Sequence, residues 1–251
     1  MKVGLIGAGN MASALAHGLG EPVLVSDVDA ERAQRLAKAV GGEALGTNSE
    51  VAERADVVVL CHKPAQLAEV AEGLSVKPKV VVSILAATRT DRIEAAYPGV
   101  PVYRFIPNIP TEVRRGVLCY APGSLAAQGP EQEILELFAR AGTIIPLEEP
   151  LLEPAMALMS CGPAFMAAVV ESLVDAGAAH GLEREKAARM AVDTMAGTAA
   201  YLDEHALDAE GLRRRVATPG GVTERGLLAL EEKAMGLAFR AAVDTVVEAT
   251  R

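Results

Sequence analysis

Five residues near the start of the chain have the types and spacing of a dinucleotide-binding turn. An apolar run ends in Gly-Ala-Gly-Asn-Met-Ala and passes directly into a stretch with helical spacing. Gly7 lets the chain turn sharply, Gly9 leaves no side chain between the backbone and a diphosphate, and Ala12 lets the helix pack on the strand. Backbone N–H groups at Asn10 and Met11, where that helix begins, would face the phosphates. The alternative is a glycine-rich turn in an α/β protein that binds nothing.

An acidic residue follows at the distance that a ribose-binding carboxylate requires. The next apolar run ends at Ser26 and Asp27, about 20 residues beyond Gly7. We expect both residues at the adenosine ribose of the cofactor. A carboxylate at this position repels a 2′-phosphate, so NADH should serve at least as well as NADPH.

A second cluster of small and hydroxyl residues interrupts a helical region near the other end of the chain. The segment Thr218-Pro219-Gly220-Gly221-Val222-Thr223 breaks the helix and exposes consecutive backbone N–H groups. Such a group of N–H donors binds a carboxylate well, here with a threonine hydroxyl on either side. The alternative is an ordinary corner between two helices, capped by its threonines.

The first 150 residues alternate between apolar runs and helical spacing. The predicted strands are 2–6, 22–26, 56–61, 80–84, 102–105, 116–120 and 143–147. This order predicts an α/β domain over residues 1–150, a Rossmann-type doubly wound parallel sheet. Ligands bind beyond the carboxyl ends of such strands. The segments expected to border one crevice are Gly7–Ala12, Ser26–Asp27, His62–Pro64, Leu85–Ala86 and Pro107–Asn108.

Residues 151–251 contain no credible strand and predict an all-helical domain. Its expected helices cover 155–179, 183–204, 208–216 and 223–250. Several of them are apolar on most faces and must be buried on all sides. We therefore expect an intertwined homodimer built from this half; the alternative is a monomer whose helices wrap on the sheet.

Composition excludes several classes of protein. The chain has 251 residues, of which 51 % are hydrophobic, and a net charge of −9, which argues against nucleic-acid binding. Three separate cysteines without metal-ligand spacing indicate reduced thiols in the cytoplasm and no metal site. No signal-peptide pattern opens the chain. The longest apolar region is interrupted by Pro163, Glu171 and Asp175, so no membrane span is expected.

Motifs spread over nearly the whole chain resemble the pyrroline-5-carboxylate reductase family. They are the glycine turn, Lys63-Pro64, Pro107–Pro110, Gly162–Phe165 and Thr218–Thr223, in that order. The resemblance implies an N-terminal Rossmann domain, a C-terminal helical dimerisation domain and an active site at the dimer interface. It also implies NADPH or NADH as reductant and often a higher oligomer, such as a pentamer of dimers.

The resemblance assigns the substrate-side residues by position. Thr223 corresponds to the threonine whose hydroxyl bonds the ring nitrogen of the substrate. Thr218, Gly221 and Val222 correspond to positions that hold its carboxylate, and Gly220 shapes the turn.

The same resemblance assigns residues of the first half. Asn48 corresponds to an asparagine at the adenosine end of the cofactor, and Lys63 and Pro64 to the loop beside its nicotinamide half. His62 adjoins that loop and is expected near the cofactor, without a role as an acid. Asn108 lies in the substrate-side loop.

The reaction implied is hydride transfer from nicotinamide C4 to the C=N carbon of Δ1-pyrroline-5-carboxylate, which gives L-proline. A β-hydroxyacid-type dehydrogenase would need a lysine on the first long helix of the second half, and 155–185 contains none. A non-catalytic NAD(H)-binding redox sensor would keep the glycine turn but would not need Thr218–Thr223. The six-membered imine stays open as a substrate, because one methylene changes binding by only about 1–3 kcal/mol.

Overall fold

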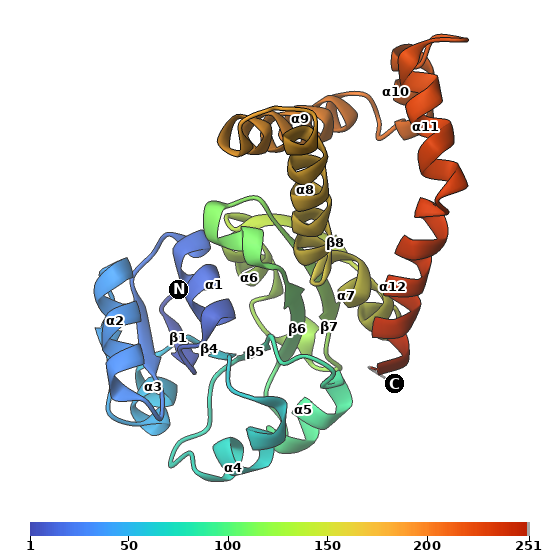
Figure 1. The fold of residues 1–251 in the computed structure, drawn as a ribbon. Coiled ribbons are helices and arrows are strands. Elements are labelled where there is room, and N and C mark those ends of the chain that lie inside the picture. The colour runs from blue at the N-terminus through green and yellow to red at the C-terminus, as the bar shows by residue number, and fades with distance from the viewer. Residues whose placement is uncertain (250–251) are drawn as a thin grey trace. The chain divides into compact units, whose positions relative to one another are not determined.

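The computed structural model describes residues 1–249 and divides into two compact units (Figure 1). The first comprises Met1–Pro163 together with Ala249, and the second comprises Ala164–Glu248. A functional division at residue 150 remains a prediction.

The first unit is built on one eight-stranded sheet in the order β3-β2-β1-β4-β5-β6-β7-β8. Its strands are β1 (Val3–Ile6), β2 (Val23–Ser26), β3 (Glu43–Ala44), β4 (Val57–Leu60), β5 (Val81–Ser83), β6 (Val102–Pro107), β7 (Gly116–Pro122) and β8 (Gly142–Pro146). Val3 pairs with Val23 on one side and with Val57 on the other, so β1 is central. Neighbouring strands in the part of the sheet ordered β3-β2-β1-β4-β5-β6 are all parallel, which confirms the predicted α/β fold class.

Two features of the sheet differ from the expected pattern. Strand β7 runs antiparallel to β6, and β8 runs parallel to β7. Only residues 108–115 join β6 to β7, and a parallel connection needs a dozen residues or more. Strand β3 has two residues, Glu43 and Ala44, neither of them buried. Strand β3 lies at the edge of the sheet and contains no apolar run, so the sequence pattern did not predict it.

Helices cover both faces of the sheet. They are α1 (Asn10–Leu19), α2 (Ala30–Val40), α3 (Asn48–Arg54), α4 (Leu67–Glu72), α5 (Thr90–Ala96), α6 (Glu131–Ala139) and α7 (Leu152–Met159). The 3-10 helices are η1 (Pro64–Gln66), η2 (Ile109–Val113), η3 (Ala126–Gln128) and η4 (Glu149–Leu151). Successive side chains of a strand point to opposite faces of the sheet, and each face is covered by helices. The buried side chains therefore form two separate hydrophobic cores.

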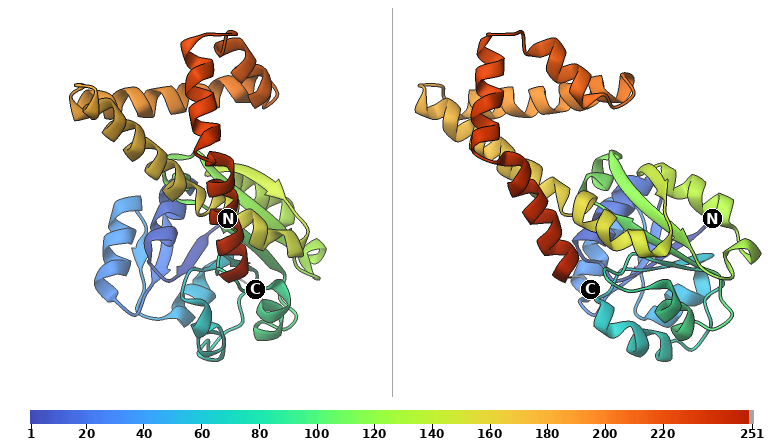
Figure 2. Two further views of the ribbon diagram at one scale, coloured as in Figure 1. Left: turned by 45° about the vertical axis from the view of Figure 1, so that its right-hand side comes forward. Right: turned by 90° about the vertical axis from the view of Figure 1, so that its right-hand side faces the viewer.

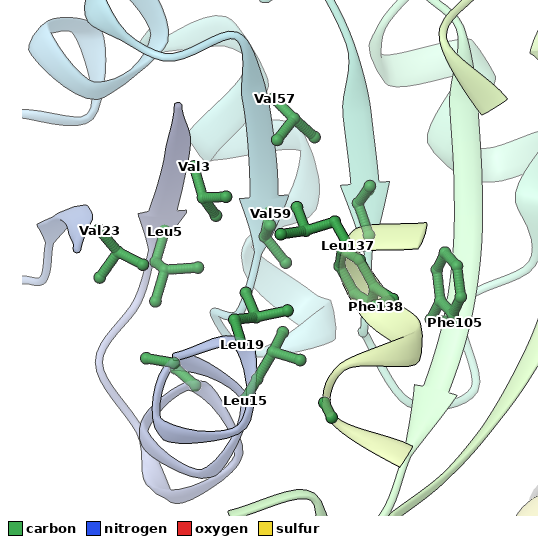
Figure 3. Packing of buried hydrophobic residues seen from close by; sticks show 14 of the residues in the cluster. Val3, Leu5, Leu15, Leu19, Val23, Val57, Val59, Phe105, Leu137 and Phe138 are labelled. Carbon is green, nitrogen blue, oxygen red and sulfur yellow. The ribbon is translucent and has the colours of Figure 1, made fainter. Parts of the chain in front are cut away.

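The larger core lies under α1, α2 and α6 (Figure 3). Leu15 of α1 is fully buried with Leu5 of β1, and Phe138 of α6 stacks on Phe105 of β6 with ring centroids 4.5 Å apart. Each side chain of this size contributes about 1.5–3 kcal/mol when buried. This core fixes α1, and with it the turn that precedes α1, on the sheet.

The second unit is all helical, as predicted. Its helices are α8 (Gly162–Ala179), α9 (Arg184–Glu204), α10 (Ala209–Val216), α11 (Val222–Glu232) and α12 (Met235–Ala249). The predicted helix 155–179 divides into α7 and α8 around Ser160. The predicted helix 223–250 breaks at Ala234, which has a left-handed φ of 57°; its expected end at Thr250 lies outside the described residues. Position 234 itself is neither glycine nor proline, so the sequence did not predict a helix break there.

The helices of the second unit leave large apolar side chains in solvent. Leu173, Met190 and Leu237 are 53 %, 54 % and 68 % exposed. Long stretches of helix face no other helix of the unit (Figure 2). By length and composition alone, the helical stretch Glu149–Ala179 is apolar enough to cross a membrane. The helix break at Ser160 and an acidic residue at Glu171 interrupt this stretch.

A buried charge cluster ties the end of the sheet region to α7. The Arg104 side chain on β6 is fully buried; its Nη1 lies 2.6 Å from Glu149 Oε1 and its Nη2 lies 3.0 Å from Glu153 Oε1. The backbone N–H and the hydroxyl of Thr90 also donate to Glu149, at 2.9 and 2.5 Å. Burial raises the pKa of Glu149, but the Thr90 hydrogen bonds and the Arg104 charge outweigh burial and lower that pKa overall.

Glu149→Gln should lower the free energy of unfolding by about 3 kcal/mol at pH 7, because it leaves a buried guanidinium with one carboxylate. The lowered pKa of Glu149 means that its contribution is present above the ordinary value of 4.5 and is lost as pH falls through the lower folded value. Urea unfolding at fixed protein concentration, at pH 7 and pH 4, measures both effects. The exposed neighbour Glu148→Gln is the control and should stay within about 0.5 kcal/mol of wild type. Equal stability of wild type and Glu149→Gln at pH 7 would show that the pair of Arg104 and Glu149 does not stabilise the fold.

Candidate functional site

The glycine turn is held tightly between two strand ends. Gly7 has a φ of +107°, and a Cβ there would lie 2.8 Å from the backbone carbon and oxygen of Cys61. The Gly7 N–H donates to Ser26 O at 2.8 Å, and the Cys61 N–H donates to Ile6 O at 2.8 Å. At Gly9, by contrast, an added Cβ would meet no atom within 4 Å. The fold therefore requires glycine at position 7. At position 9 the fold would tolerate a side chain, and glycine leaves the space beside the turn open.

Helix α1 begins directly after this turn with uncommitted donors. The N–H groups of Asn10, Met11 and Ala12 meet no acceptor within residues 1–249, whereas Ser13 N–H bonds Gly9 O at 2.9 Å. The first turn carries no acidic residue. A helix start of this kind favours an anion.

A cavity of about 190 Å³ opens beside the turn. Of the predicted cofactor residues, those lining it are Gly7, Gly9, Asp27, Asn48, His62 and Lys63. The ends of β1, β2 and β4 thus border one cavity, as expected. Predicted residues that do not line it are Ala8, Asn10, Met11, Ala12, Ser26, Pro64, Leu85, Ala86, Pro107 and Asn108. The pattern missed Ile6, Val28, Arg32, Cys61, Gln66 and Val70, which do line it.

The end of this cavity that Asp27 and Asn48 line is fixed by hydrogen bonds. Asp27 accepts from Ala8 N–H at 2.6 Å with one oxygen and from Asp29 N–H at 2.8 Å with the other. Ser26, which is buried, donates its hydroxyl to Asn48 Oδ1 at 2.7 Å. Ser26 therefore orients Asn48 from behind and leaves the Asn48 NH₂ group as a donor at the cavity wall.

The end of β4 contributes a neutral imidazole. His62 Nδ1 lies 2.9 Å from Lys63 O, which makes it the protonated nitrogen. Burial lowers the pKa of His62, although the hydrogen bond to Lys63 O opposes the shift. Its Nε2 is buried and meets no donor in the described part of the chain. An unsatisfied acceptor, an open Gly9 and free helix N–H groups together fit a ligand that carries both hydroxyls and phosphates.

The Pro-Gly-Gly corner lies in the second unit and forms a tight turn. Gly221 N–H donates to Thr218 O at 2.9 Å, and Gly220 has a φ of +75°. Pro219 and Gly220 occupy the positions that proline and glycine favour in a type II turn. A Cβ on Gly221 would lie 2.6 Å from Thr218 Oγ1, so both glycines are required by the corner.

This corner presents N–H donors at the start of α11. Across residues 1–249, no acceptor lies within reach of the N–H groups of Val222 and Thr223. The Gly220 N–H donates to Glu224 Oε2 at 2.7 Å. The corner therefore already holds one carboxylate oxygen, and both Thr218 and Thr223 are exposed beside it.

Asn108 has a structural place in the first unit. It is buried; its Nδ2 donates to Met159 O at 3.0 Å, and its Oδ1 accepts from Val117 N–H at 2.9 Å. Its contact with a substrate stays a prediction, for which one Nδ2 hydrogen is left. The described residues contain no group of three His, Cys, Asp or Glu side chains that could hold a metal ion.

Comparison with known proteins identifies the family to which the chain belongs. Residues 149–251 match the family model described as pyrroline-5-carboxylate reductase dimerisation. Residues 2–87 match the model described as NADP oxidoreductase coenzyme F420-dependent. The chain is 31 % identical to the pyrroline-5-carboxylate reductase of Methanosarcina acetivorans, over 96 % of this chain and 94 % of the relative. It is also 31 % identical to that of Aquifex aeolicus, over 93 % and 90 %.

A solved structure extends the similarity to three dimensions. The pyrroline carboxylate reductase of Plasmodium falciparum, with NADP bound, superimposes with a TM-score of 0.88 at 26 % identity. The match covers 100 % of this chain and 97 % of that one.

Gly9→Ala should fold as well as wild type yet bind NADH at least ten-fold more weakly, because the new methyl group enters space that a diphosphate would occupy. Gly7→Ala is the matched variant: its methyl group meets the Cys61 backbone at a left-handed φ, so it should lose about 2 kcal/mol or more of stability. Urea unfolding and NADH fluorescence titration separate the two effects. Unchanged NADH affinity in Gly9→Ala would exclude this turn as the diphosphate site.

Proposed function

The chain belongs to the pyrroline-5-carboxylate reductase family, and we propose that its glycine turn and its Pro-Gly-Gly corner are the two binding segments of the active site. The protein is an NAD(P)H-dependent reductase that converts Δ1-pyrroline-5-carboxylate to L-proline in proline biosynthesis. The observation that carries the proposal is the corner Thr218–Thr223, which lies inside the segment matched by the family's dimerisation model.

The cofactor segment has the donors that a dinucleotide needs. NAD(P)H, when bound, supplies the hydride. The N–H groups of Asn10 and Met11 would hold its diphosphate, and Asp27 with Asn48 would hold the adenosine ribose. The loop from His62 to Pro64 would border the nicotinamide half. The unsatisfied Nε2 of His62 supports this assignment, because a neutral imidazole accepts a hydroxyl hydrogen.

The corner segment suits the carboxylate and the imine nitrogen of the substrate. Val222 and Thr223 offer N–H donors to the carboxylate, flanked by Thr218, and Glu224 at Gly220 N–H supports the affinity of this corner for carboxylate oxygen. The Thr223 hydroxyl would bond the ring nitrogen and relay a proton as the imine becomes an amine. Clamping the acid at one end orients the C=N bond for hydride transfer.

The helical half forms the homodimer that the dimerisation model implies. Its exposed apolar side chains, among them Leu173, Met190 and Leu237, supply the surface. We propose in addition a cytoplasmic enzyme that assembles beyond the dimer, as a pentamer of dimers. The three free cysteines support a reducing compartment.

Thr223→Ala should lower kcat/KM for pyrroline-5-carboxylate by about 10²-fold, because the proton-relaying hydroxyl is lost. The assay follows NADH absorbance after the imine is added, with proline as the measured product. Thr223→Ser keeps the hydroxyl and should recover most of the lost rate. A wild-type protein that binds NADH tightly without turnover would instead be a sensor, and an unaffected Thr223→Ala would exclude the role of Thr223.

The wild-type enzyme should use NADH at least as well as NADPH, because the fixed carboxylate of Asp27 lines the cavity that we propose for the adenosine ribose. Steady-state kcat/KM values for the two cofactors, at one imine concentration and one ionic strength, provide the comparison. A strong preference for NADPH would remove the role assigned to Asp27.

A further inference from the structure

One cation at the adenosine end of the cavity was not singled out by the sequence pattern. Arg32 lies in the first turn of α2 and lines the cavity together with Asp27, Val28 and Asn48. Its side chain is 57 % exposed, so it can reach a bound molecule without a buried rearrangement. Lys63, the other cation at this cavity, follows β4 rather than β2.

The carboxylate of Asp27, which lines the same cavity as Arg32, cannot turn away from a ligand. Both oxygens of Asp27 are held by backbone N–H groups, from Ala8 on the glycine turn and from Asp29. An adenosine 2′-phosphate entering this end of the cavity therefore meets a fixed negative charge. Its binding requires a compensating cation on the same side.

Arg32 is positioned to supply that cation. Asp29 caps α2 by accepting from the N–H groups of Glu31 and Arg32, which fixes the Asp29 carboxylate. The other oxygen of Asp29 lies 3.3 Å from Arg32 Nε and anchors the guanidinium at that atom. No acceptor within the described residues engages the two Nη groups of Arg32, which remain available as a fork for phosphate oxygens.

We propose that Arg32 determines whether this cavity accepts the 2′-phosphate of NADPH. Its guanidinium stays paired with Asp29 at Nε and donates through its two Nη groups to the phosphate, so that NADPH binds alongside NADH despite the charge of Asp27. An arginine near the ribose-binding carboxylate is a known chemical solution to this problem in dinucleotide folds. The inference rests on the proposed function only in taking the cavity as the adenosine site.

The test compares two adenosine ligands on the full-length protein by calorimetry. Arg32→Gln should weaken binding of 2′-phospho-ADP-ribose about 10- to 100-fold, as expected for loss of a charge-assisted hydrogen-bonded pair. Binding of ADP-ribose should change less than about two-fold. The control is Arg35→Gln on the same helix: Arg35 pairs with Glu31 and does not line the cavity, so neither affinity should change. Equal loss for both ligands, or no loss for 2′-phospho-ADP-ribose, would overturn the proposal.

Turnover with each cofactor separates this inference from the proposed function. In Arg32→Gln the ratio of kcat/KM for NADH over NADPH should rise at least ten-fold above that of wild type. An unchanged ratio in an enzyme that reduces the imine would overturn the role of Arg32 alone. If wild type binds both ligands as predicted but never reduces the imine, the proposed function fails and the assignment of Arg32 stands.

Discussion

The close approach of the glycine turn to the end of β4 is the constraint on which the proposed cofactor site depends. Backbone atoms of Cys61 and His62 occupy the space where a Gly7 side chain would begin, within 2.9 Å. This contact brings the residues after β4 to the wall of the cavity beside Gly9. The core beneath α1 holds the turn in place, so the free N–H groups at the start of α1 need no reorganisation before an anion binds.

The two proposed binding segments use the same physical device for different anions. In each, glycine permits a turn, and a helix begins directly after it with N–H groups that lack acceptors among residues 1–249. Their surroundings differ. The glycine turn belongs to a rigid, doubly covered sheet, whereas the Pro-Gly-Gly corner belongs to helices that expose much of their apolar surface. A homodimer supplies the packing that the helical half lacks within one chain.

Patterns that depend on local geometry were predictable from the sequence. The parallel strands, the turn at Gly7 and the corner at Gly220 follow from apolar runs and from residues that tolerate a positive φ. Features set by tertiary contacts were not. The antiparallel direction of β7 depends on a short connection, the break at Ala234 on no special residue type, and Arg32 on how α2 sits over the cavity. Ser26 was predicted at the adenosine ribose, and that contact stays a prediction; the structure adds that its hydroxyl donates to Asn48, which the sequence pattern does not reveal.

The central claim is that this chain carries a hydride from a bound dinucleotide to the carbon of a cyclic imine acid. The most direct measurement uses NADH with deuterium at both C4 positions of nicotinamide and follows the product by mass spectrometry. The account predicts that each L-proline formed carries one deuterium at the carbon that was double-bonded to nitrogen. NADH oxidation that yields unlabelled proline, or no proline, would contradict it.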